Sequence, residues 1–129
     1  MVVPVRFNSR RLAVYSVDEL LKRNLLAIFG ERDVVARMKE LEAIWLSDGI
    51  FVDPDGQYVG LHAINRRVDE LQARFAGFEF IERGQVNAMY GIGRLAWGFG
   101  PADNPSAVTG IDIAVTRDGR LSALYAFID

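Results

Sequence analysis

The sequence predicts an α+β domain in which three N-terminal helices pack on one face of a curved antiparallel sheet. Apolar residues recur at helical spacing in the first half of the chain and alternate with a period of two in the second half. Helices that precede the strands, rather than alternating with them, favour this class. A chain of 129 residues suits one core. We expect residues 16–129 to form a single domain, preceded by an arm of residues 1–15.

Each predicted helix carries an apolar stripe. The first spans residues 17–29, because Ser16 and Glu19 give the capping-box signal that is typical of a helix start. The second contains the apolar stripe at residues 34–45, and the third contains the stripe at residues 64–75.

The second half of the chain is expected to form an antiparallel meander. Four β-rich runs are separated by glycines and by the loop "PADNP": "FEFIERGQVNAMY", "GRLAWGFG", "SAVTGIDIAVT" and "RLSALYAFID". Asp118-Gly119 is a strong signal for a tight hairpin between the last two runs. Asp48-Gly49 is expected to form a turn directly after the second helix.

Composition excludes several classes of function. A net charge of −2 and a pI near 5.4 argue against a nucleic-acid partner, and the basic cluster from Arg6 to Arg11 is read as a solvated arm. There is no cysteine and only one histidine, His62, so thiolate chemistry is excluded and a metal site is not expected. No apolar run suits a signal peptide or a membrane helix, so a cytoplasmic protein without a membrane partner is the default.

The third β-rich run has two apolar faces. Asp112 lies on one face with small neighbours such as Gly110 and Ala114, whereas Ile111 and Ile113 lie on the other. Three helices can cover only one face of the sheet. We therefore expect the other face to meet a second copy of the chain in a homodimer.

Taken together, these segments resemble the nuclear transport factor 2-like superfamily, in the branch of ketosteroid isomerase and the SnoaL-like polyketide cyclases. The residues that carry the resemblance are "IFVDPDGQYVGLHAI" after three helices, followed by "GRLAWGFGP", "GIDIAV" and "DGRLSALYAFID". The resemblance covers roughly residues 16–129. It implies a cone-shaped fold that encloses a mostly apolar pocket, and dimerisation through the sheet. It does not choose among the activities of the superfamily.

Two acids match catalytic positions of ketosteroid isomerase under this resemblance. Asp53 matches the general base and Asp112 matches the protonated acid of the oxyanion hole. The position of the oxyanion-hole tyrosine falls near Leu25, which cannot donate a hydrogen bond. Each acid also has a structural interpretation: Asp53 begins the turn sequence Asp-Pro-Asp-Gly, and Asp112 could form a buried ion pair with Arg94.

Five further residues are candidates for binding substrate, with no metal and no cofactor. Asn24 shares the inward stripe of the first helix, Tyr58 is one of several possible hydroxyl donors, and His62 opens the third helix. Arg94 could orient Asp112, and Trp97 could shape an apolar site.

We therefore expect a small-molecule pocket protein of the isomerase or cyclase type. It would act by proton transfer next to a carbonyl on an apolar substrate, with Asp53 taking the proton and Asp112 bonding the enolate oxygen. The alternative is a non-catalytic ligand-binding or scaffold module of the same fold.

Overall fold

The computed structural model describes residues 14–129. Its helices are α2 (Val17–Arg23), the π-helix η1 (Asn24–Phe29), α3 (Val34–Ile44) and α4 (Leu61–Arg74). Its strands are β1 (Trp45–Asp53), β2 (Gly56–Val59), β3 (Glu79–Glu82), β4 (Asn87–Met89), β5 (Ile92–Gly100), β6 (Val108–Arg117) and β7 (Arg120–Ile128). Most of the predicted arm, with the cluster from Arg6 to Arg11, lies outside the described residues.

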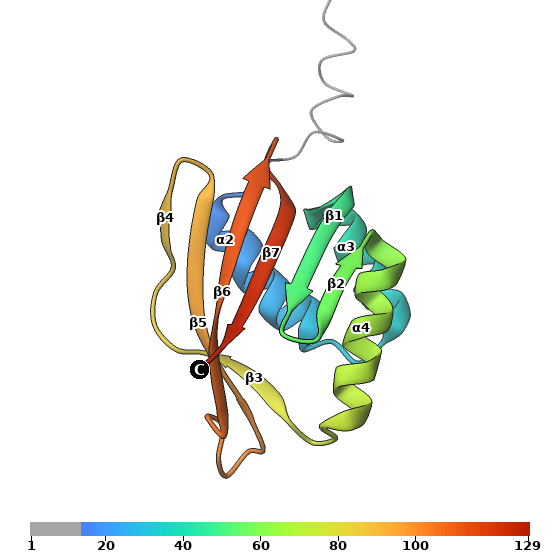
Figure 1. The fold of residues 1–129 in the computed structure, drawn as a ribbon, viewed down its shortest axis with the longest axis vertical. Coiled ribbons are helices and arrows are strands. Elements are labelled where there is room, and N and C mark those ends of the chain that lie inside the picture. Colours follow the sequence, from blue (N-terminus) through green and yellow to red (C-terminus); the bar gives the residue numbers. More distant parts are fainter. Residues whose placement is uncertain (1–13) are drawn as a thin grey trace, which may run out of the picture.

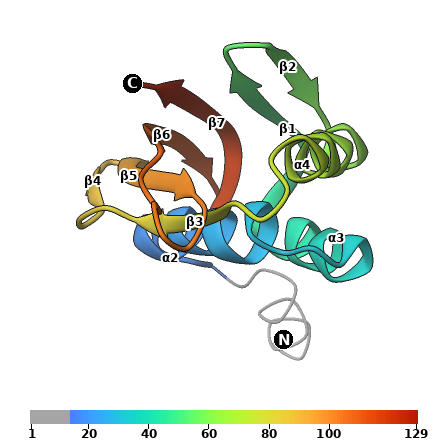
Figure 2. The same cartoon turned by 90° about the horizontal axis from the view of Figure 1, so that it is seen from below.

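The strands form one curved sheet, which is open and not closed into a barrel. Its order is β2-β1-β7-β6-β5-β3, and β4 pairs with β5 outside this path. The helices lie on one side of the sheet (Figures 1 and 2). The predicted α+β class, with helices against a curved sheet that is mainly antiparallel, is confirmed.

Two details around β1 differ from the sequence-based prediction. β1 pairs in parallel with β7, so the sheet is mixed and not a pure antiparallel meander. Asp48-Gly49 is not a turn after a helix but part of β1, where the pairing register shifts between Trp45 and Ile50. A Cβ on Gly49 would lie 2.4 Å from the Trp45 ring. This glycine therefore marks close packing inside a strand, which the Asp-Gly pattern alone cannot distinguish from a turn.

Other local predictions are confirmed in part. Ser16 and Glu19 form the predicted capping box at the start of α2. Asp118 and Gly119, both at positive φ, form the predicted two-residue hairpin between β6 and β7. The first helical stretch does reach Phe29, but its second half widens into η1. The run at residues 78–90 forms two strands, β3 and β4, rather than one.

The hydrophobic core lies between the helices and the concave face of the sheet. Its fully buried members come from α2, η1, α3 and α4 on one side and from β5, β6 and β7 on the other: Leu20, Leu21, Ile28, Leu41, Ile44, Ile64, Val68, Leu95, Ala114, Leu121 and Leu124. None of the helices among residues 14–129 is long and apolar enough to cross a membrane.

Candidate functional site

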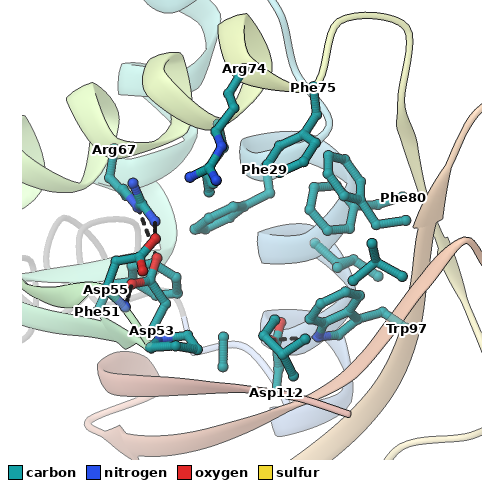
Figure 3. A pocket seen from close by; sticks show the side chains of 17 residues that line it. Phe29, Phe51, Asp53, Asp55, Arg67, Arg74, Phe75, Phe80, Trp97 and Asp112 are labelled. Carbon is teal, nitrogen blue, oxygen red and sulfur yellow. Dashed lines mark hydrogen bonds and ion pairs between the residues drawn. The ribbon is translucent and has the colours of Figure 1, made fainter.

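A cavity of about 360 Å³ lies beside this core, between the sheet, η1 and α4. Its volume suits one small organic molecule. Most of its lining is apolar and comes from seven elements and their loops: Leu25, Phe29, Phe51, Pro54, Leu71, Phe75, Phe80, Trp97, Phe99, Val108, Ala126 and Ile128. Figure 3 shows these side chains around the open space.

Five charged residues complete the lining: Asp53, Asp55, Arg67, Arg74 and Asp112. They lie at different depths. The Asp55 side chain is 61% exposed and Arg74 is also exposed, so this side of the cavity opens to water. Asp112 is only 5% exposed and lies on the opposite side of the cavity (Figure 3). The cavity therefore has a charged entrance that is open to water at Asp55 and Arg74, and a buried acid, Asp112, at its inner wall.

The carboxyl of Asp112 is held by Trp97. The indole Nε1 of Trp97 donates a hydrogen bond to Oδ1 of Asp112, with a length of 2.9 Å. Within residues 14–129, no other side chain or backbone group bonds this carboxyl. An indole N–H can only donate, so Oδ1 must act as an acceptor. When the acid is neutral, its proton is therefore on Oδ2, the oxygen that remains for a ligand.

Gly110 makes this contact possible. It lies directly opposite Trp97 in the pairing of β5 with β6, two residues before Asp112. A Cβ on Gly110 would lie 2.4 Å from Cζ2 of the Trp97 ring. The indole therefore occupies the space that a side chain on Gly110 would fill, and it reaches the acid on the same strand. Any side chain at position 110 would displace the ring.

Burial raises the pKa of Asp112 to about 7, and the hydrogen bond from Trp97 opposes part of this rise. The cause is desolvation, because an ionised carboxylate loses its hydration in an apolar cavity. The ion pair with Arg94 that the sequence left open does not form. Arg94 lies on the exposed face of β5, where its Nε donates to Asn87. Asp112 is instead a buried acid without a countercharge.

Asp53 has a different environment at the entrance. Its Oδ1 accepts hydrogen bonds from the backbone N–H groups of Asp55 and Gly56, as the turn interpretation expects. Its Oδ2 accepts from Nε of Arg67 at 2.8 Å. Both carboxyl oxygens of Asp53 are therefore already bound by donors from the protein.

Arg67 joins three carboxylates at the entrance. Besides Asp53, it donates to Asp55 through Nη2 at 2.9 Å and to Glu70 through Nη1 at 3.3 Å. Its Cζ also lies 5.1 Å from the centre of the Tyr58 ring. This network fixes the β1–β2 turn against α4.

The structure does not bring all the predicted substrate-binding residues to the cavity. Trp97 lines it, but Asn24, Tyr58, His62 and Arg94 do not. Asn24 is buried in η1 and accepts a hydrogen bond from Nε1 of Trp45. Tyr58 stacks on Phe51 behind the cavity wall, and His62 is exposed on α4.

Sequence reasoning missed Arg67 and Arg74, both on α4. Together with Leu71 they have the spacing i, i+4, i+7, which places three side chains on one face of a helix. That spacing could have identified them. Long charged side chains on a helix are usually solvated, so the spacing alone does not distinguish these two arginines from surface residues.

The position that the resemblance assigns to the oxyanion-hole tyrosine is apolar here. Leu25 lies in η1 and lines the cavity, and no tyrosine among residues 14–129 does so. The π-helical turn also brings Phe29 into the lining. Such turns occur often near functional sites, since they redirect side chains that an α-helix would place elsewhere.

No family model matches the chain, and no curated protein matches it. Solved structures do. A proposed isomerase of the SnoaL-like family from Agrobacterium tumefaciens aligns with a TM-score of 0.80 and 22% identity, covering 86% of this chain and 95% of the other. A proposed polyketide cyclase from Sinorhizobium meliloti aligns with a TM-score of 0.67 and 16% identity, covering 84% and 93%.

A third structure was solved with a small molecule bound. It is a protein with a ketosteroid isomerase-like fold from Catenulispora acidiphila, in complex with trimethylamine. It aligns with a TM-score of 0.68 and 14% identity, covering 87% of this chain and 86% of the other. At these identities the likeness concerns the fold: this chain has the nuclear transport factor 2-like fold, in the form seen in the SnoaL-like and ketosteroid isomerase-like proteins.

Proposed function

We propose that this domain binds an apolar small molecule and catalyses proton transfer next to a carbonyl group, as an isomerase or cyclase does. The observation that carries the proposal is Asp112: a buried carboxyl without a countercharge, oriented by Trp97, at the inner wall of an apolar cavity. A pKa of about 7 lets such a group both accept and return a proton near neutral pH.

The chemistry follows from the two protonation states of Asp112. The ionised carboxylate removes a proton from the carbon next to the carbonyl, and an enolate forms. In an isomerase, the now neutral acid returns the proton to another carbon of the same molecule. In a cyclase, the enolate carbon attacks an electrophilic carbon of the same molecule, and the acid protonates the oxygen that becomes negative.

The geometry favours Asp112 over Asp53 as the group that takes the proton. Asp53 accepts two backbone hydrogen bonds and one from Arg67, so both of its oxygens are engaged, whereas Oδ2 of Asp112 is left for a ligand. We assign to Asp53 the role of a fixed negative charge that holds Arg67 and the entrance turn. Its role as a base stays a prediction from the resemblance.

A binding module without catalysis is the second candidate. One observation favours it: the lining contributed by residues 14–129 contains no hydroxyl or amide side chain that could stabilise an enolate oxygen. Enolate stabilisation is often the largest single contribution to this kind of catalysis.

Deuterium exchange separates the two candidates without knowledge of the natural substrate. We would incubate β-tetralone, an apolar bicyclic ketone, with the protein in deuterium oxide and follow the loss of its acidic C–H signals by NMR. Exchange faster than in buffer, lost in Asp112→Asn and kept in Asp53→Asn, would support proton transfer by Asp112. Exchange lost only in Asp53→Asn would indicate that Asp53, and not Asp112, is the base. Binding without exchange would favour the module.

A further inference from the structure

Besides Arg67, the cavity lining contains a second arginine, Arg74, which has no role in proton transfer by Asp112. Arg74 lies seven residues after Arg67 on α4 and therefore on the same face of the helix. Figure 3 shows its side chain extending from α4 toward the open space of the cavity.

The two arginines differ in their partners. All three guanidinium nitrogens of Arg67 are engaged by carboxylates. Arg74 forms no salt bridge with any residue in the range 14–129. Its Cζ lies 5.3 Å from the centre of the Phe75 ring, a cation–π distance that supports the side chain. This contact leaves the planar N–H groups of Arg74 unused.

The nearby charges leave Arg74 able to take an anion. The lining contains two arginines and three aspartates, of which Asp112 lies apart from the other two at the inner wall. Asp53 and Asp55 both bind Arg67, and the Asp55 side chain is 61% exposed, so water screens its charge. A guanidinium in this setting suits a carboxylate, because its N–H groups match the two carboxylate oxygens.

Building on the proposed function, we infer that the substrate is an apolar ring compound that bears a carboxylate. Arg74 binds the carboxylate at the entrance, the aromatic side chains hold the ring system, and the reacting carbonyl faces Asp112 at the inner wall. The two polar contacts at opposite ends of an apolar cavity would fix the orientation of the molecule, as such contacts do in small-molecule sites generally.

A matched pair of probes tests this inference. β-Naphthoate and β-naphthamide have the same ring system, but only the first carries a charge. We would measure the affinity of both by isothermal titration calorimetry for the wild type and for Arg74→Met, which keeps an apolar stem over Phe75. Arg66→Met is the matched control, because Arg66 is exposed on the same helix and does not line the cavity.

We expect Arg74→Met to weaken β-naphthoate about fivefold to tenfold, which is the range for a partly exposed ion pair with two hydrogen bonds. It should leave β-naphthamide within about twofold, and Arg74→Lys should recover part of the loss. Arg66→Met should change neither affinity.

Three results would overturn the inference. Unchanged β-naphthoate binding by Arg74→Met would show that the arginine does not bind the anion. Equal weakening of both probes would show that Arg74 only packs against the cavity wall. An equal loss of β-naphthoate affinity in Arg66→Met would show that any positive charge on α4 attracts the anion and that Arg74 is not its specific partner. Failure of the proposed function is seen separately, when the wild type does not accelerate exchange of uncharged β-tetralone.

Discussion

Replacing Trp97 with phenylalanine should raise the pKa of Asp112 further. The substitution removes the indole N–H that donates to Oδ1 and keeps an aromatic ring in the cavity wall. Desolvation, which raises the pKa, would then act without the hydrogen bond that opposes it. The ionised form of Asp112 would lose its donor, and the neutral form would lose less.

The size of this change can be worked out from the contact. A hydrogen bond to a charged group contributes roughly 1.5–3 kcal/mol, and about 1.4 kcal/mol corresponds to a tenfold change in the acid dissociation constant. The neutral acid also loses its bond, worth roughly 0.5–1.5 kcal/mol, so the difference between the two forms is about 1–1.5 kcal/mol. The pKa of Asp112 should therefore rise from about 7 to roughly 8. The fold should persist, because the phenyl ring fills most of the space of the indole.

Carbon NMR of aspartate carboxyl groups would measure both values. The signal of Asp112 is assigned by its absence in Asp112→Asn, and chemical shifts are followed from acid to alkaline pH. Trp45→Phe is the matched control, since it removes an indole donor that bonds Asn24 and not Asp112. An Asp112 pKa near the ordinary aspartate value of about 3.9 in the wild type, or an unchanged value in Trp97→Phe, would refute the reasoning.

Three further predictions concern stability, packing and assembly. Folding raises the pKa of Asp112 from its usual range to about 7, so between these values the folded state holds a proton that the unfolded chain has lost. The free energy of unfolding is therefore highest below about pH 4 and falls by roughly 4 kcal/mol as the pH rises to 7. Chemical denaturation of Asp112→Asn at several pH values should show a flatter dependence than the wild type, and identical slopes would contradict this. Gly110→Ala should press on the Trp97 ring and on the backbone oxygen of Phe127, destabilise the fold by about 1–3 kcal/mol and change the near-ultraviolet circular dichroism. A variant with the stability and spectrum of the wild type would contradict this packing. Ile113→Lys should give monomers or insoluble protein if the outer face, where Phe127 is 59% exposed, forms a homodimer; a wild-type mass of one chain by light scattering at micromolar concentration would exclude the dimer.

The sequence predicted those parts of the fold that depend on local patterns. The capping box at Ser16, the hairpin at Asp118-Gly119 and the alternation along β6 all act within a few residues, and the structure contains all three. The pairing of β1 with β7 depends on residues far apart in the chain. The periodicity of residues 45–53 carries no information about that partner.

For the candidate site as well, the sequence predicts local features but not contacts between strands. Asp112 could be selected from sequence, because an acid among small apolar neighbours on one strand face is unusual. Its contact with Trp97 could not, since it depends on the register of β5 against β6 and on the absence of a side chain at Gly110. The ion pair with Arg94, which the sequence left open, depends on the same register: Arg94 pairs with Ile113 and lies on the other face of the sheet.

The parallel pairing of β1 with β7 has a consequence for the order of folding. Phe51 pairs with Leu124, so this contact closes a loop of 73 residues (124 − 51), and the entropy of closing such a loop makes its formation slow. Phe51 and Asp53 lie on β1, whereas Ala126 lies on β7 and Asp112 on its neighbour β6. The two walls of the cavity therefore meet only when β1 docks. A chain that has formed its hairpins but not this pairing lacks the wall of the cavity that carries Phe51 and Asp53.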